Sequence, residues 1–168
     1  NHIIFTKMKE QIDIPVFDPN AEPLMDVNKI KTILPHRSPF LMVDRITEMG
    51  EDYIVGVKMI GVNEWYFQGH FPTEPVMPGV LIIESIAQCG GMLALRDVDD
   101  PSKYSTYFAK IDNAKFKRKV VPGDVLVMRL KITEPLRRTL MCMHGEAYVG
   151  NHLACECDMM AQIIKNKE

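Results

Sequence analysis

Two residues, His70 and Glu84, stand in the stretch of the chain best suited to acid–base chemistry. His70 belongs to a loop, because residues 69–79 contain three prolines and two glycines. Glu84 is the one acidic or basic residue in the apolar run that follows, residues 80–95. A buried carboxylate is costly to keep charged unless it has partners or a proton to exchange. The two side chains are therefore candidates for a base and an acid.

The apolar run predicts a helix through the core of a domain. Its 16 residues exceed a usual strand and fall short of a membrane span. Pro78 and Gly79 fix its start. The free N–H groups of Gly79 and Val80, together with the helix dipole, form a site for an oxygen that gains negative charge. A base, an oxyanion site and an acid suit removal of a proton beside a carbonyl.

Each of these residues also has a structural interpretation. His70 alone could be an ordinary loop histidine, and Glu84 alone could be a carboxylate satisfied by backbone N–H groups. Gln88 follows Glu84 by one helical turn and lies on the same face. Its amide either orients Glu84 or a water molecule, or it is simply a satisfied helix amide. The isolation of Glu84 within an apolar helix favours a functional role.

Residues 69–88, GHFPTEPVMPGVLIIESIAQ, resemble the signature of the (3R)-3-hydroxyacyl-[acyl-carrier-protein] dehydratases of the FabZ type. Two further blocks match in order and spacing: ILPHRSPFLMVDR at 33–45 and KFKRKVVPGD at 115–124. The resemblance covers about residues 27–165. A sister family that also isomerises the product carries Asp where this chain has Glu84, so the resemblance favours the FabZ type.

The resemblance implies loss of water from a (3R)-3-hydroxyacyl thioester to give the trans-2-enoyl thioester. His70 would take the proton from C2, and the N–H groups of Gly79 and Val80 would hold the thioester oxygen. Glu84, protonated or acting through water, would assist departure of the 3-hydroxyl. No metal or organic cofactor is expected. Two alternatives stay open: a thioesterase of the same fold, and an acyl-carrier-binding module without catalysis.

The substrate would arrive on an acidic acyl carrier protein through a phosphopantetheine arm. A cationic cluster beside the third block could dock this carrier, or could be a solvated turn; it comprises Lys115, Lys117, Arg118 and Lys119. Tyr107 and Phe108 are candidates for the wall of an acyl tunnel. The formal net charge of −2 and a pI of about 6.2 suggest neither nucleic acid nor an anionic membrane surface as a partner.

The rest of the chain predicts an α+β domain rich in antiparallel strands. Strands are expected near 53–60, 106–111, 125–133, 139–149 and 153–163, with alternation clearest at 125–133. Long antiparallel strands with one buried helix predict a curved sheet wrapped around that helix, which is also the hot-dog fold that the resemblance implies. Open sheet edges predict a homodimer, and the resemblance implies a trimer of dimers.

Residues 26–168 are expected to form this domain, with Asp26 as the N-cap of a short first helix that Pro35 ends. Arg37 either binds phosphate or bonds backbone carbonyls at that helix end. Residues 1–25 predict an N-terminal arm or linker. Dehydratases of the type that this chain resembles usually begin near the following helix, so the resemblance implies fusion behind a lipid A deacetylase domain. A disordered N-terminal extension is the alternative that stays open. Lys7, Lys9 and Glu10 argue against a signal peptide, so a cytoplasmic protein without a membrane span is expected.

Sulfur-containing residues are frequent in the second half of the chain. We expect the four cysteines to be reduced core thiols and not a disulfide framework, which is typical of smaller secreted chains. A metal site is disfavoured at the five candidate ligands, because zinc sites prefer a wider spacing than Cys-x-Cys and these residues lie within apolar alternation: His144, His152, Cys142, Cys155 and Cys157. The methionines are expected to be adaptable core, and some could line the acyl channel: Met141, Met143, Met159 and Met160.

Overall fold

Six antiparallel strands form one curved sheet in the computed structural model, which describes residues 13–167. The strands are β1 (Arg45–Met49), β2 (Tyr53–Met59), β3 (Tyr104–Phe116), β4 (Val125–Ile132), β5 (Leu140–Val149) and β6 (His152–Lys165). Their order across the sheet is β1-β2-β4-β5-β6-β3. The α-helices are α1 (Val27–Lys31) and α2 (Gly79–Leu95), and the short 3-10 helices are η1 (Trp65–Gln68) and η2 (Pro101–Lys103).

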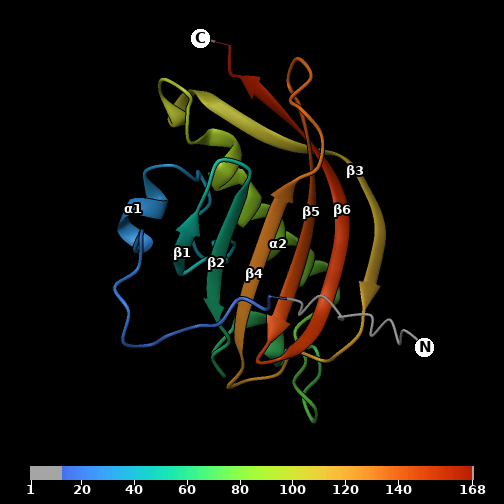
Figure 1. Ribbon diagram of the computed structural model, residues 1–168. Helices are drawn as coiled ribbons and strands as arrows, with labels where there is room; N and C mark the ends of the chain where they lie inside the picture. Colours follow the sequence, from blue (N-terminus) through green and yellow to red (C-terminus); the bar gives the residue numbers. More distant parts are fainter. Residues whose placement is uncertain (1–12, 168) are drawn as a thin grey trace, which may run out of the picture.

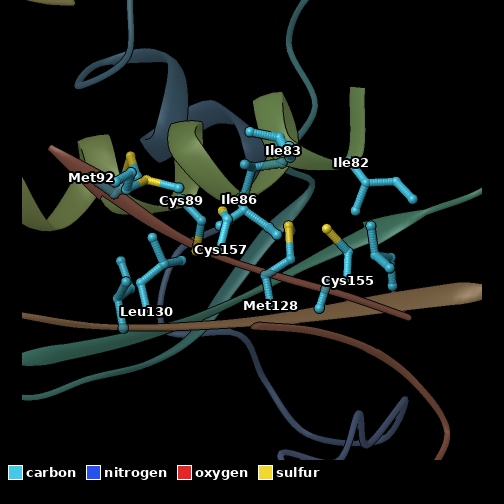
Figure 2. Packing of buried hydrophobic residues seen from close by; sticks show 14 of the residues in the cluster. Ile82, Ile83, Ile86, Cys89, Met92, Met128, Leu130, Cys155 and Cys157 are labelled. Atoms are coloured by element: carbon cyan, nitrogen blue, oxygen red, sulfur yellow. The ribbon is translucent and has the colours of Figure 1, made fainter. Parts of the chain in front are cut away.

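The sheet curves around α2, as Figure 1 shows, which confirms the expected α+β hot-dog arrangement. Eleven of the 17 residues of α2 are buried, so the helix is enclosed on most sides. Figure 2 shows side chains of α2, among them Ile86 and Cys89, on the side of the helix that faces the strand residues Met128, Leu130, Cys155 and Cys157. Burial of this apolar surface is the main force that holds helix and sheet together.

A close approach of α2 to the sheet depends on glycine. A Cβ atom at Gly90 would lie 2.7 Å from Leu130 Cδ2 and 2.9 Å from Met143 Cε. A Cβ atom at Gly91 would meet only Leu34 Cδ2, at 3.3 Å. The two glycines thus permit close packing around α2, and Gly90 is the tighter of the pair.

The first helix begins as predicted and ends earlier. Asp26 caps α1 by accepting the backbone N–H of Lys29 at 2.9 Å. The α-helix ends at Lys31, ahead of Pro35. The Arg37 guanidinium then donates to three carbonyl oxygens, those of Lys31, Leu34 and His36, at 3.0, 3.0 and 2.7 Å. This confirms the interpretation of Arg37 as a helix-end residue.

The strands match the sequence prediction with two exceptions: the edge strand β1 was not predicted, and β3 is longer than predicted. β1 was missed because its residues show no clear alternation. β3 extends well beyond the predicted 106–111, and its residues from Tyr107 onward are exposed at the free edge of the sheet. The four cysteines are free thiols; Cys89, Cys155 and Cys157 are buried, whereas Cys142 is half-buried.

The arm before α1 lies over the outer face of the sheet. Residues 1–12 fall outside the described part of the chain. Phe17 packs against the buried side chains of Val55, Val57 and Val127, and the Arg129 guanidinium donates to the carbonyl of Asp13. The boundary at residue 25 stays a prediction. None of the helices between residues 13 and 167 is both long and apolar enough to cross a membrane.

Candidate active site

The loop that follows η1 sets the position and tautomer of His70. The His70 N–H donates to the carbonyl of Tyr66 at 3.0 Å, and the His70 carbonyl accepts the N–H of Val76 at 2.9 Å. On the ring, Nδ1 lies 2.7 Å from the carbonyl oxygen of Val76. A carbonyl can only accept, so Nδ1 carries the proton. In the neutral form of the ring, Nε2 then has the lone pair that a general base needs.

The same loop is tied to the segment between β3 and β4. The Met77 N–H donates to the carbonyl of Val120 at 2.8 Å. Lys119 Nζ lies 2.6 Å from Glu74 Oε1, and this pairing lowers the pKa of the Glu74 carboxyl. The loop therefore has attachments at both its middle and its end.

His70 lines an open cavity of about 570 Å³ together with Gly79 and Val80. The first two donors of α2 that find a carbonyl are the N–H groups of Leu81 and Ile82, both to Pro78. The N–H groups of Gly79 and Val80 precede them and have no helical acceptor. The two residues predicted to supply oxyanion donors therefore line the same cavity as His70.

Three of the four residues of the cationic cluster line this cavity. Lys117, Arg118 and Lys119 line it, as does Phe116. Lys115 is not among the lining residues, and its Nζ lies 3.8 Å from Glu156 Oε1. The Phe116 ring would be 2.6 Å from a Cβ atom at position 79, so it covers the start of α2 closely.

Glu84 lines a different cavity, of about 270 Å³. Gln88 lines it too, as do Tyr107 and Phe108, the two residues predicted for the acyl tunnel. Met143 and Met159 contribute sulfur-containing side chains to the same wall. This cavity and the His70 cavity share no lining residue within the described part of one chain.

Gln88 holds Glu84 in the way that helical spacing predicts. Its Nε2 donates to Glu84 Oε1 at 2.9 Å and to the carbonyl of Phe40 at 2.6 Å. Its Oε1 accepts the N–H of Met42 at 2.8 Å. These backbone partners fix which end of the amide faces Glu84, so a donor always faces Oε1 of the carboxyl group.

A second histidine, His36, was missed by sequence reasoning. It lines the Glu84 cavity, and its Nε2 lies 3.6 Å from Glu84 Oε1. Burial lowers the pKa of His36, against the opposing effect of the Glu84 carboxylate. His36 lies in the sequence block at residues 33–45, but a histidine just after a short helix has no pattern that points to a neighbour so far along the chain.

Three of the five residues considered as metal ligands either contact another residue or are buried thiols. His144 Nδ1 lies 2.7 Å from Asp158 Oδ1 on the neighbouring strand. Burial raises the pKa of Cys155 to about 12 and that of Cys157 to about 11. Across residues 13–167, no three His, Cys, Asp or Glu side chains are grouped so that they could hold a metal ion.

Comparison with known proteins places this chain in a family. Residues 34–158 match the model of the FabA-like domain. The 3-hydroxyacyl-[acyl-carrier-protein] dehydratase FabZ of Syntrophobacter fumaroxidans is 48% identical over 139 residues, which are 83% of this chain and 94% of that protein. The chain belongs to the FabZ dehydratase family. The resemblance drawn from the three sequence blocks is therefore confirmed.

Two further comparisons define the context of this FabZ-family chain. The bifunctional enzyme LpxC/FabZ of Porphyromonas gingivalis is 58% identical over 160 residues, 95% of this chain. The chain spans only 35% of the length of that relative. Among solved structures, the dehydratase heterocomplex ApeI:P from Xenorhabdus doucetiae has a TM-score of 0.66 at 12% identity, covering 88% of this chain and 93% of that one.

A thioesterase variant from Pseudomonas aeruginosa is also similar in structure, with a TM-score of 0.63 at 13% identity, covering 84% of this chain and 96% of that one. Identities this low show a shared fold. The hot-dog fold thus carries more than one activity among its members, and the site decides between them.

Proposed function

We propose that this chain dehydrates (3R)-3-hydroxyacyl thioesters on acyl carrier protein to trans-2-enoyl thioesters in fatty-acid biosynthesis. The observation that carries the proposal is the His70 tautomer beside the free N–H groups of Gly79 and Val80. A base and an oxyanion site lie in one cavity, as proton removal beside a thioester carbonyl requires. The family relatives carry this activity in their names.

The reaction divides between the candidate groups as follows. His70 Nε2 takes the proton from C2, and the electron pair forms an enolate whose oxygen accepts the N–H groups of Gly79 and Val80. One such donor typically supplies about 3 kcal/mol of barrier lowering. The C3–O bond then breaks, and the leaving hydroxyl receives a proton from Glu84, directly or through water. The enzyme is reset when a proton passes from His70 to Glu84. No step calls for a metal or an organic cofactor.

The active site is proposed to form between two chains. In one chain, His70 and Glu84 line cavities without a common residue, yet both must reach the same substrate. β3 lies at the sheet edge with its outer side unpaired, and pairing there would form a homodimer. His70 of one protomer would then meet Glu84 of the partner subunit. Assembly of dimers into a trimer is a further expectation from the family resemblance.

The carrier protein is proposed to dock at Lys117, Arg118 and Lys119. These cations line the His70 cavity, where a phosphopantetheine arm must enter. Glu74 and Glu156 partly neutralise the cluster. The acyl chain would extend past Glu84 along Tyr107 and Phe108 into the apolar wall of the second cavity.

The whole protein is proposed to be a fusion like its bifunctional relatives, with the dehydratase as one part. Its cytoplasmic location stays a prediction. The identity to the LpxC/FabZ enzymes supports the fusion, whereas the location rests on the sequence interpretation alone.

The decisive experiment follows the ultraviolet absorbance of the enoyl thioester after addition of a 3-hydroxyacyl thioester. Wild-type protein should produce the absorbance, and His70→Ala should lose about 100- to 10,000-fold, because a positioned base supplies that much. Glu84→Gln should lose activity comparably while keeping the fold. Release of free thiol would identify a thioesterase instead. Tight binding without either product would identify a binding module.

A further inference from the structure

His36 is placed rigidly beside the catalytic carboxylate. It follows α1, where the Arg37 guanidinium bonds the carbonyls of Lys31, Leu34 and His36 itself. Its ring lines the cavity that contains Glu84 and Gln88. The exposed fractions of the two ionisable side chains are similar, 27% for His36 and 26% for Glu84, so neither is well screened by solvent.

The surroundings of Nε2 indicate where the proton of His36 lies. Between residues 13 and 167, only two buried side-chain polar atoms lack a hydrogen-bond partner: His36 Nδ1 and the Tyr66 hydroxyl. Nδ1 lacks a partner in either tautomer, so the surroundings of Nε2 decide between them. A proton on Nε2 faces the Glu84 carboxyl group, whereas a lone pair there would face a carboxyl oxygen. Burial lowers the pKa of His36; the Glu84 carboxylate acts against this effect, and Arg37 adds to it.

The N–H groups of Gln88 and His36 then both face the same oxygen of the Glu84 carboxyl group. Gln88 Nε2 lies 2.9 Å from Glu84 Oε1, and His36 Nε2 lies 3.6 Å from that oxygen. The second distance is long for a hydrogen bond, but catalytic hydrogen bonds are often long before substrate binds. Oε2 has neither contact and is free to carry a proton.

We propose that His36 is a positioning residue that holds Glu84 Oε1 as an acceptor through its Nε2–H, so that Oε2 exchanges the proton with the substrate hydroxyl. This inference rests on the proposed dehydratase function. When the proton leaves Oε2, negative charge develops on the carboxylate, and the N–H groups of His36 and Gln88 stabilise it. His36 touches Glu84 and takes no proton from the substrate.

Nitrogen NMR spectra of histidine-labelled protein test the contact without any need for turnover. At neutral pH the His36 ring should carry its proton on Nε2, and the His36→Gln spectrum assigns its signals. Glu84→Gln should lower the pKa of His36 further, because the Glu84 carboxylate raises it. A proton on Nδ1, or a His36 titration that Glu84→Gln does not move, would overturn the proposal.

Kinetics of a matched pair of variants test the role. The amide nitrogen of Gln lies as far from Cβ as His Nε2 does, whereas that of Asn corresponds to Nδ1. His36→Gln should therefore lower kcat no more than about three-fold, and His36→Asn should lower it about 10- to 100-fold, the usual effect of a lost hydrogen bond to a charged group. KM should change little in both, because the contact is with Glu84.

Circular dichroism and thermal melts establish that both variants are folded before they are compared. Equal kcat in the Gln and Asn variants, whether high or low, would show that the donor position is irrelevant and would overturn the positioning role. An inactive wild-type protein would end the proposed function instead, while the NMR spectra would still decide whether His36 donates to Glu84.

Discussion

At the scale of single residues, hydrogen bonds to main-chain carbonyls decide what each site residue can do. The Val76 carbonyl holds the proton of His70 on Nδ1 and so leaves Nε2 basic. The Phe40 carbonyl and the Met42 N–H orient the Gln88 amide, which in turn orients Glu84. Backbone partners cannot rotate as side chains do, so the chemical state of these groups is set by the fold.

The division of the cationic cluster leads to a prediction about substrate delivery. Joint replacement of Lys117 and Arg118 by Glu should raise KM for carrier-bound substrate at least about ten-fold and weaken its salt dependence. It should leave KM for a pantetheine-bound thioester nearly unchanged, since this small substrate needs no docking. Steady-state kinetics with both substrates measure the difference.

Lys115→Glu is the control, because Lys115 shares the Glu156 contact but does not line the cavity. If this control raises KM as much as the paired change does, general surface charge and not a docking site is responsible.

At the scale of secondary-structure elements, the close packing of α2 against the sheet depends on glycines, Gly90 of the helix among them. Gly90→Ala should destabilise the protein by about 1–3 kcal/mol, because the new methyl group would overlap with Leu130 and Met143. Gly91→Ala should be neutral or stabilising, since it meets one terminal methyl group at 3.3 Å and gains helix propensity. Denaturant unfolding of the two variants compares them, and equal losses would contradict this account.

A pH-sensitive cluster of three side chains connects the edge strand β3 to β6, and β6 to β5. Asp158 of β6 accepts from the Asn113 amide of β3 at 2.9 Å and pairs with His144 of β5. Asn113 first, and then His144, lower the pKa of Asp158 in the folded protein. The cluster should therefore stabilise the fold above the unfolded pKa of Asp, about 4, and lose this contribution as the pH falls through the lower folded value.

Thermal melts from about pH 6 to about pH 3 should show this loss. Asp158→Asn should melt with a shallower pH dependence, and the difference should be modest because solvent screens the half-exposed carboxylate. Parallel pH curves for the two proteins would show that the cluster does not contribute.

The elements that the sequence predicted are those with the strongest patterns. The apolar run of α2 and the alternation of β4 follow from which faces are buried, and both matched the structure within a residue. β1 and the outer half of β3 have no such burial pattern, so neither could be predicted. His70 and Glu84 were identified from residue type and setting. Their placement in separate cavities, and the approach of His36, depend on contacts between segments far apart in the chain.

At the scale of the whole molecule, the shared site predicts complementation between inactive variants. Equal amounts of His70→Ala and Glu84→Gln, unfolded and refolded together, should form heterodimers with one intact site each. Random pairing then gives about a quarter of wild-type activity, as isologous symmetry requires. Each variant refolded alone is the control. A mixture that contains heterodimers but is no more active than the controls would show that each site is built within one chain.

The separate cavities of His70 and Glu84 also affect when a newly made chain becomes active as a dehydratase. Folding of one chain is a first-order process, whereas the meeting of two chains is second-order and slows as protein becomes scarce. If catalysis requires both cavities from different chains, a newly made protomer can acquire its native secondary structure, with α2 inside its sheet, and still be inert. Its dehydration activity then begins only at the encounter with a second copy.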